Sequence, residues 1–138
     1  MANTSIFQFL GYKIIKSHID LSDVEDNELN VAIDLKGTIN KIRSTFDLVL
    51  DVTINNKTNT ILIDICALGN FSFPKEKEIN DLSNYFYMNA PALLFPYIRA
   101  YIATLTNLSG IDAINLETLN LTQYGKILEQ QTTIIIEE

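Results

Sequence analysis

The side chains of this chain that could do chemistry are one cysteine, one histidine and seventeen carboxylates. Cys66 lies in the apolar run "ILIDICALG", which favours a buried thiol acting as a small hydrophobe over a reactive one. His18 has no Cys or His neighbour at ligand spacing, so we expect no metal site. The chain has no G-x-S-x-G motif, no Cys/His pair and no glycine-rich phosphate loop. We therefore expect that the protein is not an enzyme and binds no cofactor. Of the three functional hypotheses considered below, an enzyme with a small-molecule pocket has the least support.

The carboxylates of the first half alternate with apolar residues, which is typical of strands with one solvated face. The strand phases place several of them on one face of the predicted sheet, together with two apolar residues: Asp34, Asp47, Asp51, Asp64, Val49 and Leu62. An acidic face with a small apolar island suits a basic, partly apolar partner segment. Simple solubility is an equally good explanation of the same pattern.

Four segments that alternate with period two must position these carboxylates: Gly11–Leu21, Leu29–Gly37, Phe46–Ile54 and Thr60–Leu68. Their connections are short, so they predict an antiparallel sheet with one apolar face. From Asp81 onward the apolar spacing is helical and continues to Leu108. Pro91 predicts a break or kink near 88–90, and Ser109 with Gly110 predicts the end of the helix.

The rest of the chain completes an α+β layout in one domain, residues 1–138. "IDAINLETLNL" predicts an ordered loop, and residues 122–131 predict a short C-terminal helix. The tail "TTIIIEE" has no assigned role.

Composition limits the partners of this chain. Its net charge is −7 and its pI is about 4.6, which argues against nucleic acid and anionic membrane and leaves a basic protein partner open. Hydrophobic residues make up 47% and charged residues 20%, so we expect homo-oligomerisation to cover some apolar surface. No segment resembles a signal peptide or a membrane span, and we expect a soluble, cytoplasmic protein.

The stretch "LFPYIR", Leu94–Arg99, resembles the Leu-Phe-Pro-Tyr-Ala-Arg signature of the SecB family of bacterial protein-export chaperones. The resemblance runs from about Tyr12 to Tyr124, and its flanking matches are Gly69, Phe71, Pro91, Asn115, Leu116 and Asn120. The chain departs from the family pattern in its loop, where Ile111-Asp112 replaces Phe-Pro and "TLNL" replaces Pro-Val-Asn-Phe. These departures indicate a divergent member.

The resemblance implies an ATP-independent holdase that binds unfolded or precursor polypeptides and delivers them to the motor ATPase SecA. It implies a homotetramer, a dimer of dimers, with the apolar sheet face under the helices and an oligomer interface at Ile61, Ile63 and Ile65. The implied motor-docking positions are Asp20, Leu62 and Asp64. The candidates for the client groove are Phe71, Phe73, Ile111, Leu116, Leu119 and Leu121.

A second hypothesis keeps the same fold and narrows the role. Some relatives of the family serve one client, such as an unstable antitoxin, and the loss of the loop prolines with a short tail would suit such a role.

Overall fold

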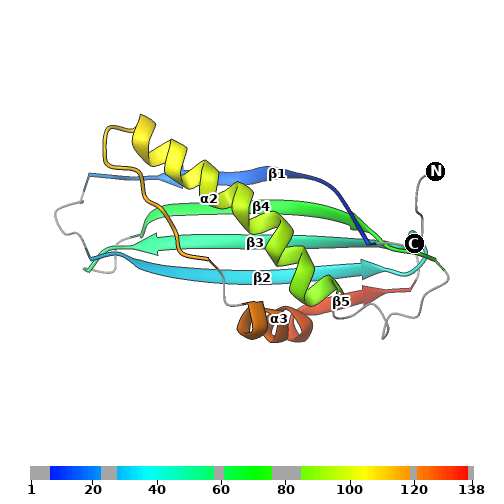
Figure 1. Ribbon diagram of the computed structural model, residues 1–138. Coiled ribbons are helices and arrows are strands. Elements are labelled where there is room, and N and C mark those ends of the chain that lie inside the picture. Colours follow the sequence, from blue (N-terminus) through cyan, green and yellow to red (C-terminus); the bar gives the residue numbers. More distant parts are fainter. Residues whose placement is uncertain (1–6, 23–27, 58–60, 76–84, 119–120, 137–138) are drawn as a thin grey trace.

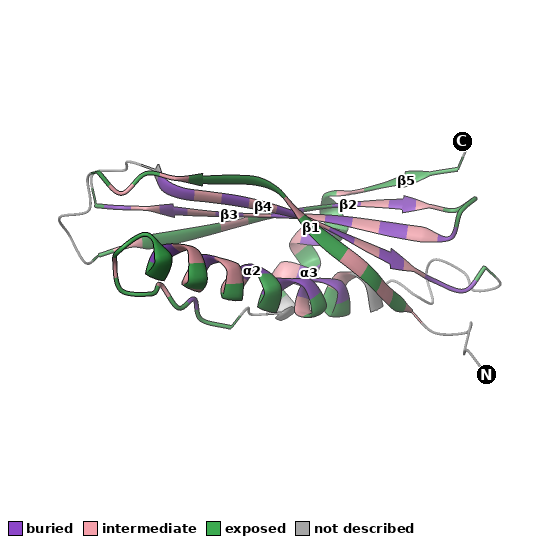
Figure 2. Cartoon of the chain, turned by 90° about the horizontal axis from the view of Figure 1, so that it is seen from above, coloured by how far each residue is buried: buried purple, intermediate pink, exposed green. Residues whose placement is uncertain are grey.

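The fold is one twisted sheet with helices on a single face (Figures 1 and 2). The computed structural model describes residues 7–22, 28–57, 61–75, 85–118 and 121–136. The strands are β1 (Gln8–Ile19), β2 (Asn30–Asn40), β3 (Thr45–Asn55), β4 (Ile61–Ser72) and β5 (Thr132–Ile135). Their order across the sheet is β1-β4-β3-β2-β5, and every pairing is antiparallel except the parallel pairing of β2 with β5.

Strand β3 shows why these residues form a sheet. From Phe46 to Ile54 every second residue is apolar and fully buried on the helix side of the sheet. The residues between them, which include Asp47, Val49 and Asp51, are partly exposed on the other side. This period of two confirms the predicted strand phases. The α+β layout with strands first is confirmed, while the sheet has a fifth strand and is mixed rather than purely antiparallel.

The fifth strand comes from the tail, and it needs a glycine in its neighbour. Gly37 of β2 lies opposite Thr132 of β5, and a Cβ at Gly37 would lie 2.7 Å from Thr132 Oγ1 and 2.8 Å from Phe46 Cε1. The backbone N–H of Lys41 closes the far end of the pairing by donating to the Ile135 carbonyl at 3.0 Å. The absence of a side chain at Gly37 therefore lets β5 approach the sheet.

The helical part has three elements: η1 (Tyr85–Asn89), a single π-helical turn, then α2 (Ala90–Leu108) and α3 (Leu121–Gln130). Pro91 lies in the first turn of α2, where its missing N–H leaves no hydrogen bond unmade. Pro96 lies inside the helix. The predicted break near Pro91 and the predicted end before Ser109 are confirmed, and so is the short C-terminal helix.

Helix α2 packs on the sheet through a stripe of residues at every fourth position, all fully buried: Ala90, Leu94, Ile98 and Ile102. The helix crosses the strands diagonally, from the β2 edge near β5 to the β1 edge (Figure 1). Figure 2 shows no helix on the opposite face of the sheet in the described part of the chain.

The same packing corrects the expected oligomer interface. Ile63 and Ile65 are fully buried within the single chain as part of the core beneath the helices. They leave no surface for a second copy, because the chain's own elements already cover them. The side chain of Ile61 lies outside the described residues.

Candidate functional site

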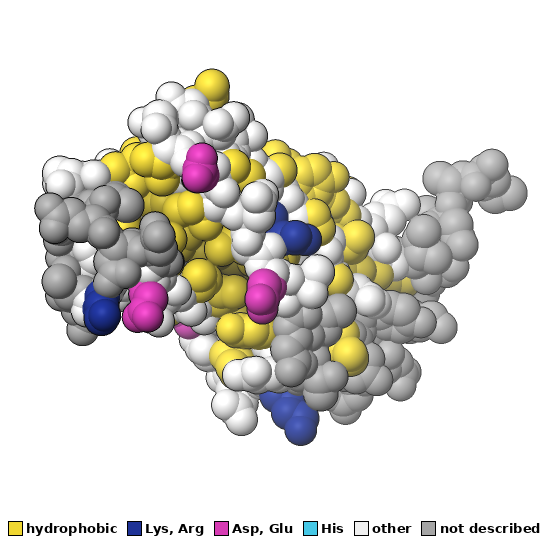
Figure 3. Space-filling view, turned by 60° about the vertical axis from the view of Figure 1, so that its left-hand side comes forward, with side chains coloured by type: hydrophobic (Ala, Val, Ile, Leu, Met, Phe, Trp, Pro, Cys, Tyr) yellow, Lys and Arg dark blue, Asp and Glu magenta, His cyan; other side chains and the backbone are white. Residues whose placement is uncertain are grey.

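A hollow of about 400 Å³ lies where β2, α2, α3 and the loop 111–118 meet, and we call it the groove. Its apolar lining consists of Leu29, Val31, Ile33, Phe95, Ile114, Leu116 and Tyr124. Figure 3 shows hydrophobic side chains gathered in a hollowed part of this side of the molecule. The groove is therefore an open hollow, in which these apolar side chains lie beside the polar residues Asn115, Glu117 and Thr118, rather than a closed core.

The groove exists because α2 and α3 together cover only part of β2. Leu35 is 0% exposed, whereas Val31, four residues earlier on the same face, is 46% exposed. The diagonal course of α2 takes its C-terminal half over β1 and away from the start of β2 (Figure 1). The loop 111–118 then returns across this end of the sheet and forms the second wall of the groove.

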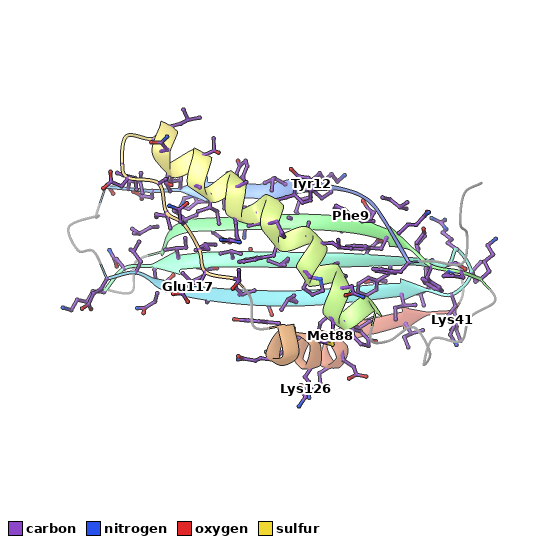
Figure 4. The ribbon with its side chains drawn as sticks, viewed as in Figure 1. Phe9, Tyr12, Lys41, Met88, Glu117 and Lys126 are labelled. Atoms are coloured by element: carbon purple, nitrogen blue, oxygen red, sulfur yellow. The ribbon has the colours of Figure 1, made fainter. Side chains whose placement is uncertain are left out.

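One carboxylate belongs to the groove. Glu117 lines it from the loop and is exposed (Figure 4). An apolar floor with an acidic residue at its rim favours apolar segments that also carry a cation.

The opposite face of the sheet carries a row of carboxylates. Asp34 pairs with Asp51 across β2 and β3, and Asp51 pairs with Cys66 of β4. Asp64 lies two residue pairs further along, opposite Thr53, and forms an ion pair with Lys16, with Nζ and Oδ2 2.7 Å apart. The acidic face inferred from the strand phases is thus present.

Two of these carboxyl groups differ in acidity. Burial raises the pKa of Asp51 to about 6, and the hydrogen bond and charge of Asp64 add to this rise. Burial also opposes ionisation of Asp64, but hydrogen bonds with Lys16 and Asp51 outweigh it, so the pKa of Asp64 is lowered. At neutral pH Asp51 and Asp64 carry two nearby negative charges, and Lys16 supplies one positive charge beside them.

The outer face differs from the expectation at Leu62 and agrees with it at Asp20. Leu62 is 1% exposed, so the expectation that it faces solvent beside Val49 is wrong. Asp20 is exposed and closes a local turn, since its Oδ1 accepts hydrogen bonds from the Ser22 N–H at 3.0 Å and the Ser22 hydroxyl at 2.6 Å. The side-chain hydrogen bond from Ser22, followed by its backbone hydrogen bond, lowers the pKa of Asp20.

The described part of the chain contains no helix long and apolar enough to cross a membrane. Within the same residues, no group of three or more His, Cys, Asp or Glu side chains is arranged to hold a metal ion.

The family model of the preprotein translocase subunit SecB matches residues 15–131, which include β2, β3, β4, α2 and the loop that walls the groove. The chain belongs to the SecB family. It is 26% identical over 91 residues to the protein-export protein SecB of Anaplasma phagocytophilum, which covers 62% of this chain and 58% of that relative. The chain therefore matches little more than half of the length of that relative.

A solved structure shares the fold. A SecB-like chaperone of Mycobacterium tuberculosis, in complex with a peptide from the HigA1 antitoxin, has a TM-score of 0.69 and 15% sequence identity. The similarity covers 83% of this chain and 88% of that one. At this identity the comparison shows that the SecB-like fold extends over most of the chain.

The groove candidates of this SecB-family chain fall into three groups. Leu116 lines the groove, and Ile111 is half-buried at the start of the same loop without lining it. Phe71 is fully buried and Phe73 is 7% exposed. Leu119 and the side chain of Leu121 lie outside the described residues.

Phe71 is a core residue rather than a groove residue. Its ring packs on Phe7, Phe9 and Phe46 with centroid distances of 5.1, 5.0 and 6.0 Å. Phe46 and Phe71 are neighbours across β3 and β4, so this cluster fills the apolar face at the end of the sheet away from Val31. The assignment of Phe71 to the groove is therefore wrong.

The apolar groove residues that sequence reasoning missed are Ile114 of the loop and those of β2 and the helices. Leu29, Val31 and Ile33 share their alternating face with Leu35, and the pattern cannot distinguish a covered position from an open one. Phe95 lies inside the LFPYIR signature and Tyr124 in α3, where each has the spacing of a core residue. Only the tertiary arrangement shows that Val31 is exposed and that Leu29, Ile33 and Tyr124 are partly buried, while Phe95 belongs to the core and reaches the groove from it.

Proposed function

We propose that this protein is an ATP-independent holdase chaperone that binds apolar segments of unfolded or precursor polypeptides in the groove. The observation that carries the proposal is an open apolar groove between β2 and the loop 111–118 in a chain of the SecB family. Burial of apolar surface contributes roughly 25 cal/mol per Å² without requiring a particular side-chain code. Such a groove suits many different clients.

Charge supports a preference among those clients. The chain carries a net charge of −7, and Glu117 lies at the rim of the groove. Apolar segments flanked by Lys or Arg gain attraction to this surface, and acidic segments are repelled. The preference weakens with salt, because the Debye length falls to about 3 Å at 1 M.

The proposed assembly is a homotetramer, a dimer of dimers, and its support is an apolar surface distinct from the core. Leu10 and Ile15 lie at the two irregularities of β1 and are exposed. Beside them Tyr12 stacks on Tyr97 of α2 with ring centroids 4.6 Å apart, and both rings remain partly exposed. A second copy packed on this β1 and α2 surface would remove these exposed apolar and aromatic side chains from water.

We further propose that clients pass to a SecA-type motor at the acidic sheet face. Asp64 and Asp20 remain the docking candidates, since both carboxylates are on the surface. Leu62 is buried and offers no contact in this structure. A basic partner segment would compete with Lys16 for Asp64.

A second candidate function is a SecB-like chaperone dedicated to one client. It is favoured by the M. tuberculosis structure, which is a SecB-like chaperone bound to an antitoxin peptide.

One experiment separates these proposals. Suppression of aggregation is measured for several unrelated unfolded proteins, together with the native mass of the chaperone. A tetramer that protects many clients supports the general holdase, and protection of one client alone supports the dedicated chaperone. A monomer of ~16 kDa that protects none contradicts both.

A further inference from the structure

We propose that Arg99 and Thr106 are positioning residues: they hold the loop 111–118 on α2 in one register, so that Ile114 and Leu116 face the groove. The inference concerns how the groove is built. The expected effect of these two attachments on client binding rests on the proposed function, whereas their expected effect on the loop does not.

Thr106 makes the first attachment. It continues the buried stripe of α2 four residues after Ile102 and is 0% exposed, although it is polar. Its hydroxyl donates to the Ile102 carbonyl at 2.8 Å and accepts the backbone N–H of Ile114 at 2.9 Å. A buried hydroxyl needs such partners, and here one of them belongs to the loop.

Arg99 makes the second attachment. Its Nε–H donates to the carbonyl of Leu116 at 3.0 Å in a partly buried setting. Arg99 and Thr106 are seven residues apart, which brings them to the same side of the helix about 10 Å from each other. The loop therefore runs back along α2 with one attachment near each end of the segment 114–116.

Register matters because neighbouring residues of an extended segment point to opposite sides. Ile114 and Leu116 are two apart and are the half-buried and the buried residue of this segment, whereas Asn115 and Glu117 also line the groove but are exposed. A slip by one residue would bring Asn115 or Glu117 to their places. Leu116 also lines a second hollow of about 240 Å³, between the loop and α2 beside Arg99, so it separates the two hollows.

The test uses variants that remove one attachment each and keep the size of the side chain. Thr106→Val removes the hydroxyl, and Thr106→Ser restores it. Arg99→Met removes the donor and keeps the aliphatic stem. Ser109→Ala is the matched control, because the Ser109 hydroxyl donates to the Leu105 carbonyl at 2.6 Å within the same helix end and does not touch the loop.

Two measurements are made on the full chain. Hydrogen exchange by NMR reports the Ile114 amide, which should exchange about fivefold faster in Thr106→Val, because a typical hydrogen bond is lost. Binding of reduced, carbamidomethylated ribonuclease A, a permanently unfolded basic probe whose cysteines carry neutral caps, should weaken by about three- to tenfold in Thr106→Val and Arg99→Met. Thr106→Ser and Ser109→Ala should match the wild type in both.

Each measurement can overturn the inference by itself. Unchanged Ile114 exchange in Thr106→Val would show that the hydroxyl does not hold the loop, whatever the probe does. Faster exchange with unchanged probe binding would show that the register of the loop does not shape the groove. In that case wild-type binding, and with it the proposed function, would still stand.

Discussion

Val31 gives the sharpest test of the groove. It lines the groove and is 46% exposed, so a client can still bury about half of its side chain. Complete burial of a valine is worth about 1.5–3 kcal/mol, which leaves about 0.7–1.4 kcal/mol for the client to gain at this position. Val31→Ser should therefore raise the Kd for an unfolded client by about three- to tenfold.

The control for this variant is Ile42→Ser. Ile42 is 45% exposed but lies in the turn after β2, next to Lys41 at the other end of the strand (Figure 4). The two positions are about 30 Å apart along the strand. The same loss of exposed apolar surface should leave client binding unchanged there.

The assay is fluorescence anisotropy of a labelled, permanently unfolded protein titrated with each variant, with thermal unfolding measured in parallel. Equal Kd values for Val31→Ser and Ile42→Ser would refute the groove as the binding surface. A large fall in the melting temperature of Val31→Ser would show that Val31 stabilises the fold, contrary to its exposure.

Three further predictions concern the sheet. Phe71→Ala should lower the free energy of unfolding by about 3–5 kcal/mol in urea denaturation, since the ring is fully buried, and a loss below about 1 kcal/mol would contradict its place in the core. Asp51 has a folded-state pKa of about 6 against 3.8 for the free group. Its contribution to the free energy of unfolding is therefore fully present below about pH 4 and is lost as the pH rises through 6. Relative to Asp51→Asn, the free energy of unfolding of the wild type should fall by about 1–3 kcal/mol between about pH 4 and pH 7. If the free energies of unfolding of the two proteins changed in parallel with pH, the raised pKa would be contradicted. Gly37→Ala should push β5 away from β2, because the added Cβ would lie 2.7 Å from Thr132 Oγ1. Faster hydrogen exchange at the Lys41 amide would report this separation of the strands. An unchanged exchange rate would show that β5 accommodates the methyl group.

Much of the sheet could be predicted from local pattern. The alternation in β3 and β4 assigned each side chain to a face, and that assignment holds from Phe46 to Ile54 and from Ile63 to Ala67, while Leu62 departs from it. Local pattern suffices there because a strand on a half-covered sheet has a period of two, so neighbouring positions must differ in burial.

The loop and the tail show where local pattern was insufficient. The Thr106 hydroxyl contacts Ile114 only because the chain turns back after Gly110, whose φ is +97°. The segment Thr132–Ile135 of the tail becomes β5 through pairing with β2, about ninety residues earlier in the chain. Such pairings depend on contacts far apart in sequence, which no window of neighbouring residues contains.

What the sequence by itself determined is the order of the elements, the two faces of the sheet and, through "LFPYIR", the family. What only the tertiary structure decided is which apolar residues remain available. Val31 and Leu35 have the same place in the alternation, yet one is 46% exposed and the other 0%. The physical reason is the arrangement of the helices: α2 runs diagonally toward β1 and α3 packs on β2, and together they leave the start of β2 open. Two helices that are narrower than the sheet cannot cover every strand along its whole length.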